Sequence, residues 1–165
     1  MKEIPTMFRT ELYHAVSVHF PIAILCLCAI ITILYLIFRN NKIGNNLRFT
    51  VSILLLFGYL SFWIAYYTGK NAYPMVVREI CDPSVLKNHL YWVYVSGYFF
   101  GGALICDMIY NFNSVKKLKF YFNIITSLLI LSGTGFLAYA GHLGAEVVYQ
   151  QAGGVYIPDE KCREF

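Results

Sequence analysis

The chain has 165 residues, of which 58% are hydrophobic, 18% aromatic and 13% charged, and its formal net charge is +4. Soluble domains carry roughly 25% charged residues, so this composition excludes an ordinary soluble domain and predicts an integral membrane protein. The small positive charge gives no indication of nucleic-acid binding.

Four apolar segments, taken in chain order, are long enough to cross a bilayer as helices. They cover residues 14–38, 49–67, 89–111 and 120–149, and a membrane-spanning helix needs roughly 20 residues. We therefore expect an all-α fold, with residues 1–165 forming a single four-helix transmembrane bundle. We identify no internal repeat. Because no cleavage pattern follows the first segment, we expect this segment to stay in the mature protein.

The short connections after the first and third segments are rich in basic residues. These residues are Arg39, Lys42 and Arg48 in one connection, and Lys116, Lys117 and Lys119 in the other. The positive-inside rule makes both connections cytoplasmic, so both termini face outward. The sequence thus predicts a multi-pass protein of a bacterial inner membrane, with its termini on the periplasmic side.

Only two cysteines, Cys81 and Cys162, lie outside the apolar segments, and both fall on the predicted outer side. Because disulfides persist in an oxidising compartment, we predict a bridge between them that ties the C-terminal tail to the loop after the second segment. Two free thiols are the alternative. The other three cysteines lie in apolar segments and are interpreted as packing residues.

All four histidines fall near the outer ends of the predicted helices. His14 and His19 lie at the start of the first segment, His89 opens the third and His142 closes the fourth. Ionisable groups in membrane segments are functional candidates, and imidazoles from facing helices can ligate haem iron. Our hypothesis is that these four residues bind haem b. Interfacial anchoring of the rings is the alternative interpretation.

The spacing of the first two histidines suggests more than one haem. His14 and His19 would point about 140° apart on a regular helix, so they are poorly placed to bind one iron together. One or two haems are therefore expected, each with one ligand from the first segment and one from the third or fourth, and the pairing stays open. Pro21 fits the first turn of a helix, which would place the helix start near Phe20 and His14 on a preceding turn.

Several neighbouring residues could assist such a site. The outer halves of the segments are rich in tyrosine and tryptophan, and the third and fourth segments in glycine, which suits either a macrocycle or ordinary helix packing and aromatic belts. Glu146 lies one helical turn after His142 and could bond its ring. The outer cations Arg9, Lys70 and Lys87 could pair with haem propionates or be solvated charges.

Two other features have structural interpretations. Asp107, near the inner end of the third segment, is interpreted as a capping carboxylate or a partner for Lys116 and Lys117. The sequence "TGKNAYP" at residues 68–74 contains a glycine stop signal and is expected to end the second helix.

The chain resembles a known family in four places: "HAVSVHFPIAIL", "YTGKNA", the histidine that opens the third segment, and "GHLGAEVVY". The family comprises bacterial four-helix inner-membrane proteins catalogued as a domain of unknown function, some of them fused to cytochrome c domains. The H-x-x-x-x-H-F-P and G-H-L-G elements are the most specific. The family's usual proline and glycine are replaced here by Ala15 and Ala145. The resemblance implies a haem-associated role carried by the four histidines.

These observations favour a b-type cytochrome that transfers electrons at the periplasmic face as part of a respiratory chain. Such a protein is an electron carrier or oxidoreductase subunit rather than a stand-alone enzyme. Its candidate partners are the lipid bilayer, a cytochrome c, a quinone and other subunits of a respiratory complex. The alternatives are a structural accessory subunit without a cofactor, and a non-haem copper or zinc site.

Overall fold

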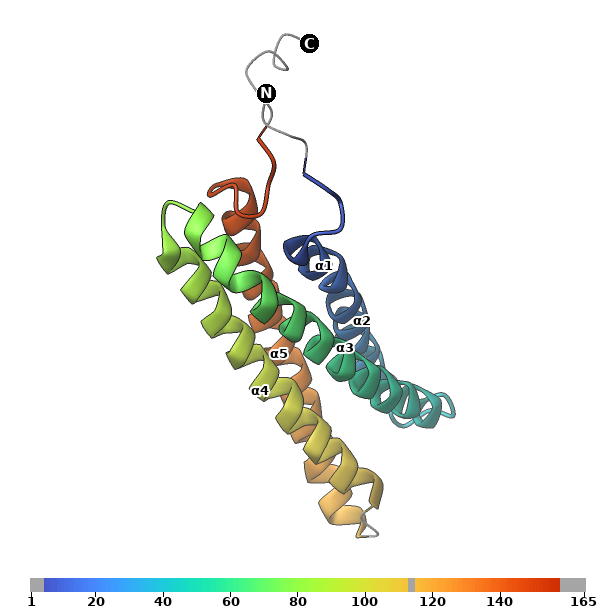
Figure 1. Ribbon diagram of the computed structural model, residues 1–165. Coiled ribbons are helices and arrows are strands. Elements are labelled where there is room, and N and C mark those ends of the chain that lie inside the picture. Colours follow the sequence, from blue (N-terminus) through green and yellow to red (C-terminus); the bar gives the residue numbers. More distant parts are fainter. Residues whose placement is uncertain (1–4, 113–114, 158–165) are drawn as a thin grey trace.

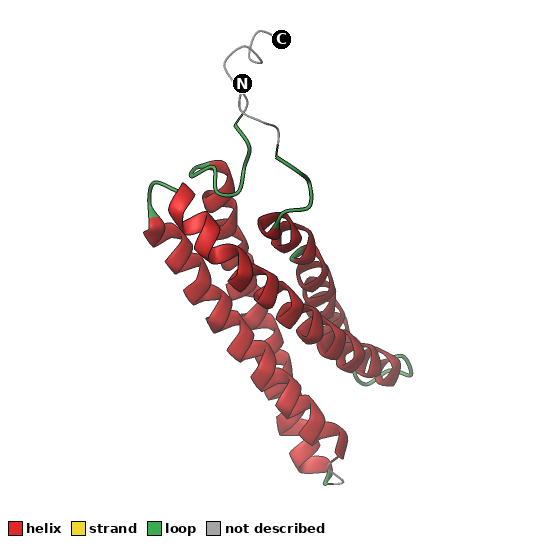
Figure 2. Ribbon diagram, in the orientation of Figure 1, coloured by secondary structure: helices red, strands yellow, loops and turns green. Residues whose placement is uncertain are grey.

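The computed structural model describes residues 5–112 and 115–157, except for the side chain of Lys116. Throughout this part the regular secondary structure is helical, in five elements: α1 (Thr10–Ser17), α2 (His19–Phe38), α3 (Gly44–Glu79), α4 (Pro83–Phe112) and α5 (Lys116–Tyr149) (Figures 1 and 2). Together α1 and α2 form one apolar span, so the described residues contain four spans long enough to cross a membrane. The predicted all-α fold with four membrane-spanning helices is confirmed.

The second predicted segment is only part of a longer helix. The expectation that this helix ends within residues 68–74 is wrong, because α3 continues to Glu79. Ala72 and Val76, one turn apart on α3, are both buried, and their packing stabilises the extension. Pro74 lies inside the helix and provides no amide donor for the carbonyl of Lys70, but Lys70 is exposed.

The first span is divided at a single residue, Val18, which itself keeps helical backbone angles. Val18 separates α1 from α2, and Pro21 lies in the first turn of α2, where it has no amide to offer the carbonyl of Ser17. As predicted, the longer helix therefore begins close to Phe20. His14 lies before the break, on the short helix α1.

The helices form two antiparallel hairpins, one of α1–α2 with α3 and the other of α4 with α5 (Figure 1). Contacts of α3 with α4 and of α2 with α5 join the hairpins into a four-helix bundle. We call the end where α1 and α4 begin and α3 and α5 end the site end. The opposite end, with the two short connections inside the hairpins, is the loop end.

Several contacts of the first hairpin recur in the second, a relation that the sequence analysis did not identify. A shift of 75 residues, the separation of His14 and His89, brings one hairpin onto the other. In the first hairpin the fully buried Leu25 lies where a side chain at Gly58 would be. In the second, the fully buried Phe100 does the same at Gly133. Leu25 and Phe100 are 75 residues apart, and so are Gly58 and Gly133.

Contacts between the hairpins obey the same relation. The side chains of Tyr35 on α2 and Asn123 on α5 lie near one another across the interface between the hairpins. Correspondingly, the Arg48 guanidinium on α3 lies 4.1 Å from the centre of the Tyr110 ring on α4. Tyr35 and Tyr110 are 75 residues apart, and so are Arg48 and Asn123. Each contact therefore maps onto the other, as it would under a two-fold axis. Because α2 and α4 run in the same direction, the axis runs along the bundle, as in membrane proteins built from parallel repeats.

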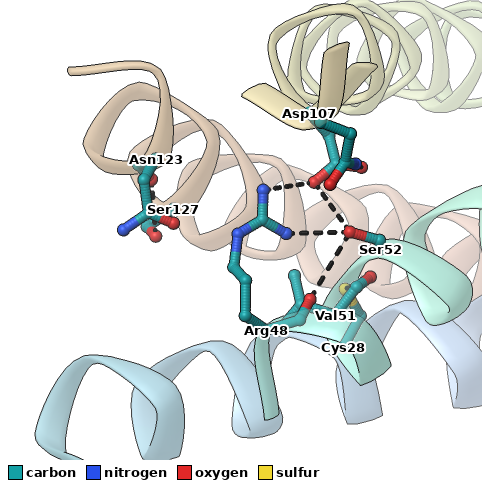
Figure 3. A network of polar contacts seen from close by, with 8 residues as sticks. Cys28, Arg48, Val51, Ser52, Asp107, Asn123 and Ser127 are labelled. Atoms are coloured by element: carbon teal, nitrogen blue, oxygen red, sulfur yellow. Dashed lines mark hydrogen bonds and ion pairs between the residues drawn. The ribbon is translucent and has the colours of Figure 1, made fainter. Parts of the chain in front are cut away.

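A buried ion pair joins the hairpins near the loop end (Figure 3). The guanidinium of Arg48 on α3 contacts the carboxylate of Asp107 on α4, and the two side chains are 6% and 4% exposed. Arg48 also donates to the Ser52 hydroxyl at 2.9 Å, and Ser52 donates to Asp107 at 3.1 Å. Asn111 donates to the second carboxylate oxygen at 3.0 Å. Several hydrogen bonds thus support the buried carboxylate.

This ion pair corrects two interpretations of the sequence. Asp107 is neither a capping group nor a partner for Lys117, because its carboxylate lies inside the bundle against Arg48; the side chain of Lys116 lies outside the described residues. Arg48, which we counted among the basic residues of the first connection, belongs to α3 and is 5% exposed. A buried carboxylate recruits a buried cation because either charge alone would be costly in this environment.

Candidate functional site

The ring of His14 lies across α3 at the site end. Its Nδ1 is 3.0 Å from the carbonyl oxygen of Ala65. A carbonyl can only accept, so Nδ1 carries the proton and Nε2 of the neutral ring keeps its lone pair. The ring also covers Gly69, where an added Cβ would come within 2.7 Å of the imidazole. Only glycine allows the ring to lie this close to α3.

The ring of His89 on α4 lies on α5 in the same way. Its Nδ1 is 2.8 Å from the carbonyl oxygen of Ala140, and an added Cβ at Gly144 would lie 3.2 Å from the ring. Each histidine therefore bonds a carbonyl 51 residues further along the chain and covers a glycine one turn beyond it. The second imidazole, too, keeps the lone pair on Nε2.

These two arrangements occupy equivalent positions at the site end. His14 and His89 are both half-buried. Histidines that bind metal commonly donate their second ring nitrogen to a carbonyl or carboxylate, which fixes the ring and its tautomer. Both residues have this second-nitrogen contact already in place.

Around His14 there are hydroxyl groups that the other half lacks. The hydroxyls of Ser17 and Thr68 are 2.7 Å apart, and Thr68 lies 3.4 Å from Nδ1 of His14. Thr68 also donates to the carbonyl that the His14 ring uses, at 2.9 Å. At the equivalent positions of the second half stand Trp92 and Leu143. The two imidazoles are therefore held alike by α3 and α5 but have different neighbours.

The aromatic residues expected near the site are present on both sides of it. The hydroxyls of Tyr66 on α3 and Tyr94 on α4 are hydrogen-bonded to each other at 2.9 Å. Next to Tyr66, the ring of Trp63 makes an edge contact with a centroid distance of 5.5 Å. On the other side, Trp92 stacks on Phe136 of α5 at 5.5 Å. These contacts brace α3 against α4 and α4 against α5 at the level of the imidazoles.

The other two histidines lie outside this arrangement. His19 is exposed, and its ring contacts the carbonyl of Val16 in its own span at 3.3 Å. His142 is 67% exposed and pairs with Glu146 at 3.2 Å, the contact that their spacing predicts. The structure thus gives two of the four predicted ligands, His14 and His89, an equivalent setting at the site end, and the remaining two face the surface of the chain.

Of the three predicted outer cations, Arg9 makes an ion pair. Arg9 pairs with Glu11 at 3.1 Å and donates to the Gly154 carbonyl at 3.5 Å. Lys70 and Lys87 are exposed. Arg9 therefore links the start of α1 to the turn that follows α5.

The predicted disulfide concerns a residue that the structure does not cover. Cys81, in the turn between α3 and α4, is exposed and has a free thiol within the described residues. Cys162 lies outside the described residues, so the bridge between the two stays a prediction.

Three of the four positions beneath the two rings escaped the sequence analysis, because each contributes a backbone atom or a missing side chain. The fourth, Gly144, is one of the glycines that it noted in the fourth segment. Ala65 and Ala140 provide carbonyl oxygens, while Gly69 and Gly144 provide space. A signal was nevertheless present, since the pattern A-x-x-x-G occurs in each half at the same distance after a histidine. Searching for this spacing would have revealed both the site and the repeat.

Two histidines are enough to hold a haem, although they are too few for most other metal sites. A six-coordinate haem iron takes only two protein ligands, and the pair of imidazoles supplies two unprotonated Nε2 atoms. Gly69 and Gly144 let the two imidazoles lie close to the backbones of α3 and α5. Among the described residues, no group of three or more histidine, cysteine, aspartate or glutamate side chains is arranged to hold a metal ion.

Comparison with known proteins gives no relative: no family model, no curated protein and no solved structure matches the chain.

Proposed function

We propose that the protein is a membrane b-type cytochrome that binds one haem b between His14 and His89 and carries electrons. One observation supports this above all: the two halves place an imidazole at equivalent positions, each with its Nδ1 bonded to a backbone carbonyl. A ligand with two equivalent faces, such as a haem with two axial positions, matches a site made from two equivalent halves.

In this function the chain holds and orients the haem. The carbonyls of Ala65 and Ala140 fix the rings and increase the basicity of Nε2, which strengthens an axial ligand. Gly69 and Gly144 keep side chains out of the space beside the rings. When bound, the haem supplies a one-electron redox centre. Electron transfer of this kind requires no catalytic acid, base or nucleophile from the chain.

The basic connections at the loop end support an orientation with the site end at the periplasmic face of a bacterial inner membrane. Electrons would then enter and leave at that face, because the site lies at one end of the bundle. A cytochrome c, a quinol or another respiratory subunit would be the partner. The resemblance to the four-helix inner-membrane family favours the same redox setting.

An absorption spectrum with a pyridine haemochrome assay of the purified protein tests this proposal. We expect a Soret band, sharp reduced α and β bands, and one haem b per chain. Replacing either His14 or His89 by alanine should abolish the six-coordinate spectrum. His19→Ala and His142→Ala are the matched controls, because these rings are exposed, and both should leave the spectrum unchanged.

Other outcomes would lead elsewhere. Two haems per chain, with loss of one in His19→Ala or His142→Ala, would restore the scheme in which all four histidines are ligands. A protein that stays colourless after reconstitution with haem would refute the cytochrome. Elemental analysis of such a sample would then identify copper or zinc, and an absence of bound metal would favour the accessory subunit.

A further inference from the structure

The two equivalent histidines are carried by very different helices. His14 belongs to α1, which has eight residues, none of them buried. This helix packs against α2 and α3, and its Glu11 lies beside Gly154 in the turn after α5. The break at Val18 separates it from the long helix that follows. A short helix with little buried apolar surface belongs to the least stable part of a fold. Moving α1 would therefore displace fewer buried residues than moving α2, α3 or α4.

His89 has no such freedom. It lies in the second turn of α4, a continuous helix of 30 residues that packs along α5. Leu86, one turn before it, is buried in a cluster with Val147 of α5. Moving the His89 ring would require moving α4 itself. The two rings have equivalent contacts, but the helices that carry them are held differently.

Polar contacts rather than apolar packing hold α1 in place. They are the bond of His14 to the carbonyl of Ala65, the contact between the hydroxyls of Ser17 and Thr68, and the bond of Arg9 to the Gly154 carbonyl. Each can be exchanged for a bond to water when α1 moves away. Opening therefore exposes few apolar groups.

We infer that His14 is an exchangeable axial ligand, and that its departure opens the iron to a neutral diatomic molecule such as carbon monoxide or nitric oxide. This inference rests on the proposed haem site. The bond from Nε2 of His14 to the iron breaks, a bond from the diatomic ligand to the iron forms, and no electron is transferred. His89 remains bound throughout.

The surroundings favour a small uncharged ligand. The positions next to His14 on α3 are occupied by Ala65 and Gly69, which provide no charge to attract an anion and room for only a small molecule once the ring has left. The Thr68 hydroxyl still donates to the Ala65 carbonyl after the ring has left, so it adds no charge to this part of α3. A neutral gas can also reach the site through the membrane.

Alanine variants of the full-length haem protein test which ligand is exchangeable. His14→Ala should keep its haem, now five-coordinate on His89, and bind carbon monoxide rapidly. His89→Ala should lose its haem, because the remaining ligand lies on the weakly held helix. Equal retention or equal loss of haem in both variants would overturn the inference. A wild-type protein without haem would instead refute the proposed function.

Kinetics in the otherwise native site give a second test. The rate of carbon monoxide binding to the reduced protein should reach a plateau at high gas concentration, because release of His14 limits it. Thr68→Val should raise that plateau by about 2- to 12-fold, the factor expected for one lost hydrogen bond. Thr50→Val is the control, since this exposed threonine bonds only its own helix. A failure of the wild-type protein to bind the gas, or equal rates in all three proteins, would contradict the inference.

Hydrogen exchange provides a measurement that does not depend on haem. In the full chain without haem, the amides of α1 should exchange faster than those of the second turn of α4, where His89 lies. Equal protection of the two segments would show that His14 and His89 are held equally firmly, and would count against an exchangeable His14.

Discussion

The two halves of the bundle share a histidine, an alanine and a glycine at the site end, whereas their buried charges at the loop end differ. At the site end, His14 and His89 have equivalent carbonyl and glycine neighbours. At the loop end, Arg48 of the first half corresponds to Asn123 of the second, and Asp107 of the second half corresponds to Thr32 of the first. All four of these loop-end side chains are buried.

Electrostatics explains why the halves differ at the loop end. If both halves carried arginine at the position of Arg48, two cations would be buried near the axis, and two copies of Asp107 would bury two anions. One cation in the first half and one anion in the second neutralise each other across the interface. Equivalent halves can thus share a symmetric site, whereas a buried charge requires an unequal partner.

The largest effect should come from breaking this ion pair. Asp107→Leu leaves the Arg48 guanidinium buried without its partner and should lower the free energy of unfolding by about 3–5 kcal/mol. Equilibrium unfolding in detergent micelles measures the change. The control is the double variant Arg48→Met with Asp107→Leu, which removes both charges and should recover most of the loss. A double variant as unstable as the single one would mean that apolar packing, and not charge, decides the effect.

Moving the ion pair to the symmetry-related positions tests the two-fold relation itself. In a background with Arg48→Asn and Asp107→Thr, the changes Thr32→Asp and Asn123→Arg should each be unfavourable alone and compensate one another when combined. We expect a coupling free energy of about 1–3 kcal/mol from the corresponding double-mutant cycle, measured by the same unfolding experiment. Additive effects would show that positions 32 and 123 do not meet as the repeat requires.

The sequence predicted the spans well because apolar length is a local property. It missed the repeat because equivalent positions share size or burial more often than identity, as Leu25 and Phe100 illustrate: both are fully buried, yet one is aliphatic and the other aromatic. It also took Gly69 for a helix stop. A glycine that ends a helix and a glycine that admits a ring from another helix have the same local sequence signal.

The sequence predicted the depth of the candidate ligands but not which of them share an equivalent setting. Helical spacing placed all four histidines near one end, but depth along a helix does not determine which way a ring points. His14 and His19 point about 140° apart around the helix axis. His14 therefore lies on α3, whereas His19 is exposed. The charge partner of Asp107 was missed because Arg48 lies 59 residues away and next to a basic loop.

A smaller effect should distinguish glycines that receive a histidine from glycines that do not. At Gly69 a new Cβ would meet the His14 ring at 2.7 Å, so Gly69→Ala should displace the ring and cost about 1 kcal/mol, the value of the lost hydrogen bond. At Gly141 nothing lies within 4 Å, so Gly141→Ala should be neutral or stabilising by up to about 1 kcal/mol. Thermal unfolding compares the two, and equal effects would contradict the close approach of His14.

The smallest effect concerns how the two histidine helices begin. Asp82 caps α4 by accepting the amide of Ser84 at 2.9 Å, whereas α1 has no side-chain cap. Hydrogen bonds from the Ser84 hydroxyl and amide lower the pKa of Asp82. The cap therefore stabilises the fold at pH values above the pKa of the unfolded chain, and its contribution is lost as the pH falls through the lower pKa of the folded protein.

Thermal unfolding of three proteins at neutral and acidic pH isolates this contribution. Asp82→Ala should unfold at a slightly lower temperature than wild type at neutral pH, and the difference should vanish in acid. Asp82→Asn is the control, because asparagine also caps a helix but does not titrate, so its stability relative to Asp82→Ala should not depend on pH. A difference that persisted unchanged in acid would mean that the Asp82 carboxylate is not the cap. The start of α4 would then be no better fixed than the start of α1, which removes one reason for the unequal hold on His14 and His89.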